Sequence, residues 1–210
     1  MSERPEDEIP ATDLELPAIE FDSPGRFAIH NPAAETTLSA KPEPAPFQLG
    51  KHQTLERFAS ADLARAHALA LLQQARRRIC IYSGDLEPWL YNHSSVQDAC
   101  TQLLLASPRN QLHILVQDVR RAVQDGHRLI NLSRRLSSNC SIRRVNPEHP
   151  ASEGSFLLVD DCALWRRPEP SQYAGYVYYS NPGRLRQQLQ LFQQAWSYSL
   201  SDPDLRSFLL

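Results

Sequence analysis

Residues 79–118 read ICIYSGDLEPWLYNHSSVQDACTQLLLASPRNQLHILVQD. Two short apolar runs, Ile79–Tyr82 and Leu112–Val116, are typical of strands buried on both faces. The residues between them repeat apolar side chains at helical spacing: Val96, Ala99, Cys100, Leu103 and Leu104. A strand, a helix and a strand at this spacing predict two parallel strands of one sheet joined by a crossover helix.

The same alternation continues on both sides of this stretch. On the amino-terminal side, apolar residues three and four apart predict a helix over Thr54–Arg77. On the other side we expect a helix from Asp125 to Ser137 and a third strand over Cys140–Val145. The sequence therefore predicts a parallel beginning to the sheet.

The second half of the chain changes character. Phe156–Val159 and Ala163–Arg166 flank Asp160-Asp161 and predict an antiparallel hairpin, and Tyr173–Tyr179 predicts a further strand. A long helix is expected to begin at Asn181, followed by a short helix over residues 202–210. The predicted fold is a mixed α/β sheet with helices on both sides.

Charge divides the chain into two unlike parts. Residues 1–50 hold three basic and ten acidic residues and eight of the sixteen prolines, whereas residues 51–210 carry a net charge of +5. We expect residues 1–50 to be a disordered acidic arm and residues 51–210 to form the α/β domain. The arm can act as a solubilising tail or as an acidic strap that docks on a basic surface.

Several classes of protein are excluded at this stage. No run of eighteen or more apolar residues is present, so we expect no membrane-spanning helix. The first ten residues, MSERPEDEIP, are acidic and do not resemble a secretory signal. The four cysteines lie at least twenty residues apart, which argues against a zinc finger and a disulfide scaffold. We expect a cytoplasmic protein.

One short motif connects the predicted fold to a known family. Residues 153–161 read EGSFLLVDD. The phospholipase D superfamily has the signature HxKxxxxD at a strand that ends in the aspartate. With Asp160 at the aspartate position, Glu153 stands at the histidine position and Ser155 at the lysine position. Residues 52–210 resemble one half of that fold. They also resemble an uncharacterised bacterial family of degenerate single domains without the HxK motif, some of which accompany acetyltransferase domains.

The resemblance implies a scaffold that has lost its chemistry. The family's reaction uses a histidine nucleophile, a second histidine as acid and lysines that neutralise the phosphate. Glu153 repels a phosphate and Ser155 carries no charge. We therefore predict no catalytic residues, no cofactor and no metal, and a pseudoenzyme that acts as a protein-interaction or regulatory module. The partner can be a second copy of the chain, because half-size members of the superfamily resemble halves that pair.

Two alternatives remain open. Arg134-Arg135 and similar arginine pairs, together with tyrosines at 173–179, suit a nucleic-acid or phospholigand binder. His127 and Arg128, at a predicted helix start after a strand, form a candidate anion site, and His127 can also serve as the base of an enzyme of unassigned chemistry. The ligand-binding prediction therefore names His127, Arg128, Arg134 and Arg135.

Two further patterns suggest sites of other kinds. Asp85, Asp118 and Asp160 end predicted strands, where a metal can bind in open α/β sheets, although aspartate is also common in turns. A cysteine hydrolase would need Cys80 or Cys162 beside a histidine, but both lie in apolar strands where cysteine is a small buried side chain.

Overall fold

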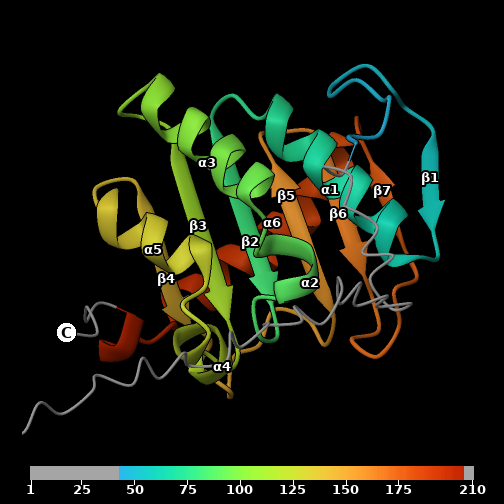
Figure 1. The fold of residues 1–210 in the computed structure, drawn as a ribbon. Helices are drawn as coiled ribbons and strands as arrows, with labels where there is room; N and C mark the ends of the chain where they lie inside the picture. Colours follow the sequence, from blue (N-terminus) through green and yellow to red (C-terminus); the bar gives the residue numbers. More distant parts are fainter. Residues whose placement is uncertain (1–42, 206–210) are drawn as a thin grey trace, which may run out of the picture. The chain divides into compact units, whose positions relative to one another are not determined.

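A computed structural model describes residues 43–205, which fold around a seven-stranded mixed sheet (Figure 1). The strands are β1 (Leu55–Phe58), β2 (Arg78–Ser83), β3 (Gln111–Val116), β4 (Cys140–Arg144), β5 (Ser155–Val159), β6 (Ala163–Arg167) and β7 (Gly175–Tyr178). The helices are α1 (Ala61–Gln74), α2 (Pro88–Tyr91), α3 (Ser94–Ala106), α4 (Arg120–Gln124), α5 (Arg128–Arg135) and α6 (Pro182–Ser197), with a 3-10 turn over Pro203–Leu205.

The sheet has the predicted parallel and antiparallel parts. Its order is β1-β7-β6-β5-β2-β3-β4. Strands β2, β3 and β4 run parallel, and β5, β6, β7 and β1 follow in antiparallel pairs. The parallel part follows from the crossover helices α3 and α5, and the antiparallel part from the tight Asp160-Asp161 turn between β5 and β6. The predicted mixed α/β fold is confirmed.

Helices cover both faces of the sheet. Figure 1 shows α1, α2, α3 and α5 on one face and α6 behind the other. The larger apolar core lies under the first group and includes Leu71, Ile81, Ile114 and Trp165. The smaller core lies under α6, where the Tyr82 and Phe156 rings stack with centroids 5.0 Å apart. Because adjacent side chains of a strand point to opposite faces, β2 supplies both cores.

The predicted helix over Thr54–Arg77 is wrong at its beginning. Residues 55–58 form β1, which pairs with β7 in the register Leu55 to Tyr178 and Phe58 to Gly175. The helix begins only after Ser60, whose hydroxyl accepts a hydrogen bond from the Leu63 amide at 3.3 Å. The cap and the pairing with a strand far along the chain overrode the helical spacing of the apolar residues.

The predicted helix over 125–137 is also shorter than expected. Gly126, with φ of 60°, ends the preceding α4 segment, and His127 caps α5. Helices α4 and α2 were not predicted, because four or five residues carry too little periodicity. Of the predicted helix over 202–210, the described part is the 3-10 turn, and residues 206–210 lie outside the described range.

Residues 1–42 of the predicted arm, which spans residues 1–50, lie outside the described residues. Residues 43–50 run along α1, where the Ala45 amide donates to the Ala66 carbonyl at 3.0 Å and the Leu49 amide to Gln74 Oε1 at 2.8 Å. Phe47 packs against the larger core. Among residues 43–205, no helix combines the length and the apolar character that crossing a membrane requires.

Candidate functional site

A cleft of about 420 Å³ opens at the end of the sheet where β2 and β3 finish and β5 begins. Buried Glu87, Ser155 and Arg167 line its interior, and the more exposed Asp85, Asp118 and Arg121 also line it. These residues come from five segments that meet because β5 is antiparallel to both β2 and β6. This edge of an open α/β sheet is where ligands commonly bind.

A buried ion pair occupies the interior of this cleft. The Glu87 carboxylate pairs with the Arg167 guanidinium and accepts hydrogen bonds from the hydroxyls of Ser83, at 2.7 Å, and Ser155. Both charged side chains are about 95% buried. Removing one partner from such a pair leaves an uncompensated charge in the interior.

Further contacts hold Arg167 in place. Its guanidinium donates to the carbonyls of Pro170, at 2.8 Å, and Gln172, at 3.1 Å, and lies 5.3 Å from the centre of the Trp89 ring. Four groups thus fix this cation, which leaves it little freedom to turn toward a ligand.

The loop that supplies Glu87 has an unusual backbone. Leu86 and Glu87 have φ values of 64° and 29°, in the left-handed region that non-glycine residues seldom adopt. Ser83 Oγ accepts from the Leu86 amide at 2.9 Å, and Asp85 Oδ1 accepts from the Glu87 amide at 3.0 Å. These bonds hold a conformation that costs about 1–3 kcal/mol per residue. The loop therefore places the Glu87 carboxylate against Arg167.

The more exposed side chains of the cleft are also paired. Asp118 binds the Arg120 guanidinium at 2.7 Å, which lowers the pKa of the carboxyl to about 2. Arg121 lies 3.5 Å from Asp85 and 3.6 Å from Asp125. The lining of the cleft holds three carboxylates against two guanidinium groups. Such a lining does not attract a phosphate.

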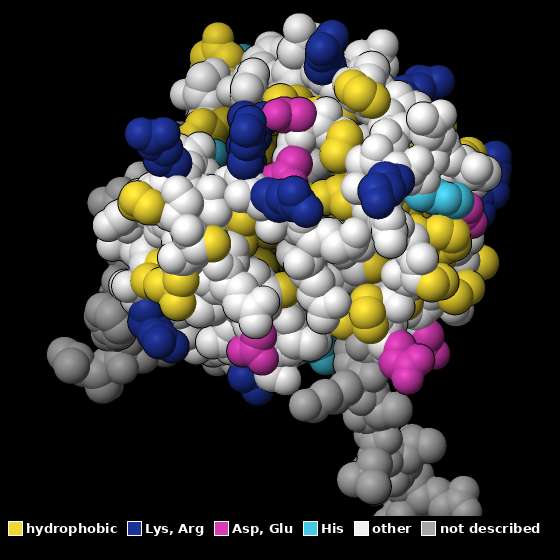
Figure 2. Space-filling model, turned by 90° about the horizontal axis from the view of Figure 1, so that it is seen from above, with side chains coloured by type: hydrophobic (Ala, Val, Ile, Leu, Met, Phe, Trp, Pro, Cys, Tyr) yellow, Lys and Arg dark blue, Asp and Glu magenta, His cyan; other side chains and the backbone are white. Residues whose placement is uncertain are grey.

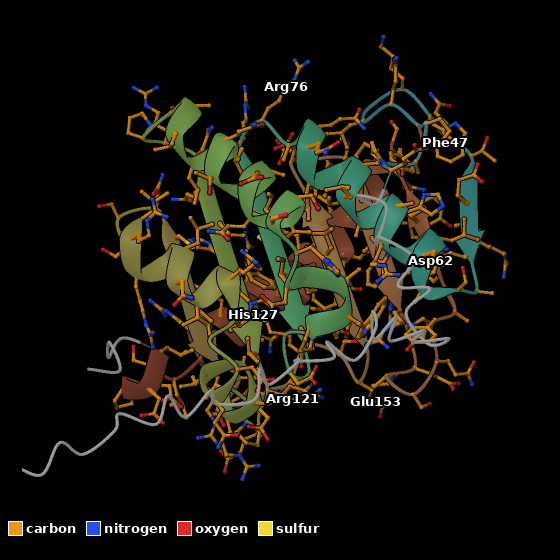
Figure 3. The ribbon with its side chains drawn as sticks, in the orientation of Figure 1. Phe47, Asp62, Arg76, Arg121, His127 and Glu153 are labelled. Carbon is orange, nitrogen blue, oxygen red and sulfur yellow. The ribbon has the colours of Figure 1, made fainter. Side chains whose placement is uncertain are left out.

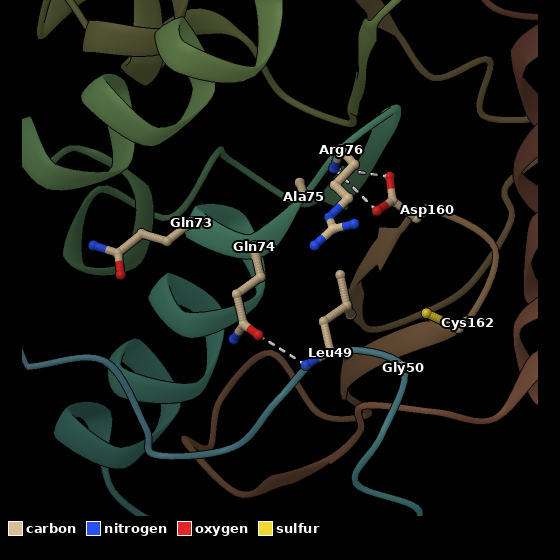
Figure 4. Close-up of a pocket in the computed structure, with 8 residues that line it drawn as sticks. All are labelled: Leu49, Gly50, Gln73, Gln74, Ala75, Arg76, Asp160 and Cys162. Atoms are coloured by element: carbon tan, nitrogen blue, oxygen red, sulfur yellow. Dashed lines mark hydrogen bonds between the residues drawn. The ribbon is translucent and has the colours of Figure 1, made fainter. Parts of the chain in front are cut away.

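The three positions that the sequence aligns with the HxKxxxxD motif are divided between the two ends of β5. Glu153 is exposed in the loop before the strand, at the same end as Arg121 (Figure 3). The Ser155 hydroxyl faces Glu87 in the cleft. Asp160 follows the other end of β5, where its carboxylate accepts from the amides of residues 76, 77 and 78 at 2.8–3.0 Å. Figure 4 shows the bonds to Arg76. Asp160 therefore anchors the loop before β2 and lies away from the cleft.

The predicted His127 and Arg128 lie at the start of α5. His127 is fully buried, and its Nδ1 accepts from the Leu129 amide at 3.2 Å as the helix cap. Burial lowers the pKa of the imidazole to about 4, so it is neutral at pH 7. Arg128 is exposed and donates to Gln97 Oε1 at 3.3 Å.

The predicted Arg134 and Arg135 lie in the last turn of α5. The Arg134 guanidinium donates to the carbonyls of Asp204, at 2.9 Å, and Leu205, at 3.3 Å, whereas Arg135 is exposed. Neither lines the cleft, nor do His127 and Arg128. Ligand binding by these four residues stays a prediction.

The structure also places the remaining candidate residues. Asp85 and Asp118 share the cleft, but Asp160 lies at the opposite end of the sheet. Within residues 43–205, no three His, Cys, Asp or Glu side chains are grouped as a metal site requires. Cys80 pairs in register with His113, but burial raises the pKa of its thiol to about 12. The thiol is therefore protonated at neutral pH and is a poor nucleophile.

Sequence reasoning missed the central pair of the cleft. Glu87 and Arg167 are 80 residues apart, and nothing local to either one indicates the other. One local signal was available. Glu87 lies between the turn residues Gly84-Asp85 and Pro88, so the sequence places a carboxylate just after a buried strand.

Comparison with solved structures identifies the fold. TrmBL2, described as an archaeal chromatin protein with a novel mode of DNA binding, matches with a TM-score of 0.54 and 9% identity, over 72% of this chain and 55% of its own. NucT from Helicobacter pylori matches with a TM-score of 0.51 and 9% identity, over 71% of this chain and 99% of its own. The chain thus spans little more than half of TrmBL2. The fold is phospholipase D-like.

Comparison with protein families gives the family. No curated protein matches the chain. A family model described as a domain of unknown function, DUF7931, matches residues 60–208. That match covers most of the chain and nearly all of the sheet and its helices. The chain therefore belongs to the DUF7931 family.

Proposed function

We propose that this protein is a non-catalytic phospholipase D-like module that acts by binding a partner. The observation that carries the proposal is the Glu87–Arg167 pair, which also engages the Ser155 hydroxyl. Ser155 stands at the lysine position of the family's motif, and the residue at the histidine position, Glu153, is an exposed carboxylate. Among the described residues, those that line the cleft offer no imidazole and no lysine to a phosphodiester.

The chemistry of phosphoryl transfer supports this proposal. The reaction needs a nucleophile aligned with phosphorus and cations aimed at the oxygens that gain charge. In the cleft, Arg167 neutralises Glu87, and Arg121 lies between Asp85 and Asp125. His127 is buried as a helix cap, so the alternative of an enzyme that uses it as a base gains no support from the geometry.

A hydrolysis assay tests the proposal. The full chain is incubated with bis(p-nitrophenyl) phosphate and with labelled DNA and RNA, beside Glu153→Ala and His127→Asn variants. We expect no release of product that scales with protein concentration. Turnover that scales with the wild-type protein and is lost in either variant would overturn the proposal, because a contaminating enzyme would not respond to these substitutions.

We propose nucleic-acid binding without catalysis as a second candidate function. TrmBL2, which shares this fold, is a chromatin protein that binds DNA. In this chain, arginine side chains gather at the end of the sheet opposite the cleft (Figure 2). Binding that weakens steeply with added salt is the expected behaviour, and a flat salt response would contradict it.

A further inference from the structure

Two hollows meet at Asp160, at the end of the sheet opposite the cleft. One, of about 510 Å³, is lined by Arg76, Leu49 and Cys162 among others (Figure 4). The second, of about 250 Å³, is lined by Arg77, Arg78 and Arg109. Both include Asp160 in their lining, so together they form one shallow surface, which we term the arginine end. Figure 3 shows Arg76 far from Arg121 and Glu153.

The carboxylates of the arginine end already have partners. Asp160 accepts hydrogen bonds from the backbone amides of residues 76–78, and Asp161 pairs with Arg78 at 3.1 Å. Among the described residues, no carboxylate lies within ion-pair distance of the Arg76, Arg77 or Arg109 guanidinium groups. All three residues are exposed.

Helix capping does not account for these arginines. Helix α1 ends at Gln74 and α3 at Ala106, and neither has a basic residue in its last turn. The arginines follow in the loops that lead into β2 and β3. Arg76, Arg77 and Arg109 therefore carry positive charge at exposed positions, where a polyanion can supply the partner.

The linings of the arginine end and of the cleft differ in their balance of charged side chains. The arginine end holds four guanidinium groups and two carboxylates, whereas the cleft lining holds two guanidinium groups and three carboxylates. A polyanion is therefore drawn to the end away from the cleft.

The lining also indicates which polyanion fits. Within residues 43–205, neither hollow is lined by Phe, Tyr or Trp, on which the bases of a single strand would stack. A duplex keeps its bases stacked internally and presents closely spaced phosphates, which arginine forks bind without reading sequence. The geometry thus favours a double helix held by its backbone.

We propose that the arginine end binds the phosphate backbone of duplex DNA through Arg76, Arg77 and Arg109. This inference rests on the proposed function, since the DNA is held at the end opposite the cleft and is not cut. Arg78, which is engaged by Asp161, contributes its charge.

The test compares three sets of variants of the full chain by fluorescence anisotropy with a labelled 20-base-pair duplex. The first is Arg76→Gln/Arg77→Gln/Arg109→Gln. The second is Arg128→Gln/Arg135→Gln on α5. The third is a control with the same loss of charge, Arg57→Gln/Arg184→Gln/Arg186→Gln, at exposed positions outside both hollows. Thermal melts confirm that each variant is folded.

We expect the first variant to bind the duplex at least tenfold more weakly at low salt. The slope of its log affinity against log salt should become shallower by about 3, because each lost phosphate contact removes about 0.9 from the slope. The affinities of the control and of the α5 variant for the duplex should stay within about twofold of the wild-type affinity. An equal loss in the control, a loss confined to the α5 variant, no binding by wild type, or equal competition by polyglutamate would each overturn the inference. Gels of the bound duplex report cleavage separately, so failure of the proposed function is distinguishable from failure of binding.

Discussion

Arg167 and Glu87 form a buried ion pair in which each partner neutralises the charge of the other. Each partner is about 95% buried, and the carboxylate also receives two hydroxyl groups. Such a pair adds little net stability compared with apolar residues, but breaking it leaves a charge without a partner. The consequences of removing one residue or both are therefore different.

Replacing Arg167 with Met is expected to lower the free energy of unfolding by about 3–5 kcal/mol, because the Glu87 carboxyl group is left buried without its cationic partner. The double variant Glu87→Gln/Arg167→Met should recover most of that loss. Urea denaturation followed by circular dichroism measures both. Arg120→Gln removes an exposed, solvent-screened ion pair and should lower the stability far less than Arg167→Met does. Equal destabilisation by Arg167→Met and Arg120→Gln would contradict the role given to the buried pair.

His127 makes stability depend on pH. Its pKa is lowered by burial to about 4 in the folded protein, below the ordinary value of 6.5, so protons bind the unfolded chain more readily. The stabilising contribution is complete above pH 6.5 and is lost as pH falls toward 4. Between pH 7 and pH 5 the loss amounts to about 2 kcal/mol.

The variant His127→Asn retains a capping side chain without the titration. Urea denaturation of both proteins at pH 7 and pH 5 should show a difference in stability that narrows by about 2 kcal/mol at the lower pH. The pKa of buried His67 is also lowered, but His67 is present in both proteins, so its contribution cancels in the difference between them. A difference that is unchanged between the two pH values would show that His127 is not neutral in the folded state.

At the scale of elements, the β5–β6 pair brings the cleft together. Gly154 precedes β5, and a Cβ atom added there would lie 2.2 Å from the Pro168 carbonyl oxygen and 2.3 Å from that of Arg167. Only glycine allows the two backbones to approach this closely. The close contact sets the position of Arg167 beside Ser155.

Gly154→Ala is therefore expected to destabilise the protein by about 1–3 kcal/mol, because backbone atoms must move. Gly84→Ala is the matched control, since a Cβ atom there meets nothing within 4 Å. Thermal melts of both variants measure the effect. A Gly154→Ala variant as stable as Gly84→Ala would mean that the β5 and β6 ends are farther apart than described.

The elements also show what the sequence could and could not predict. Strands β2, β3, β4 and β5 and helices α3 and α6 carry strong apolar patterns and were predicted within a few residues. Strand β1 was not predicted, because its partner strand β7 lies about 120 residues farther along the chain. In the same way, Ser155 was predicted from a local motif, whereas the partners that fix its hydroxyl depend on the order of β2, β5 and β6 in the sheet.

At the scale of the whole molecule, a phospholipase D-like sheet carries opposite chemistry at its two ends. The end that holds Glu153 and Ser155 contains the Glu87–Arg167 ion pair and a cleft lined by more carboxylates than guanidinium groups, and the other end contains exposed arginines. We infer that the fold now serves as a scaffold for binding.

A crystal structure of the full chain soaked with tungstate, an analogue of phosphate, shows whether the cleft binds such an anion. We predict no anion in the cleft and an intact Glu87–Arg167 pair. A tungstate ion bound there, with Arg167 turned away from Glu87 to contact it, would contradict the proposal that the cleft does not bind phosphoryl groups.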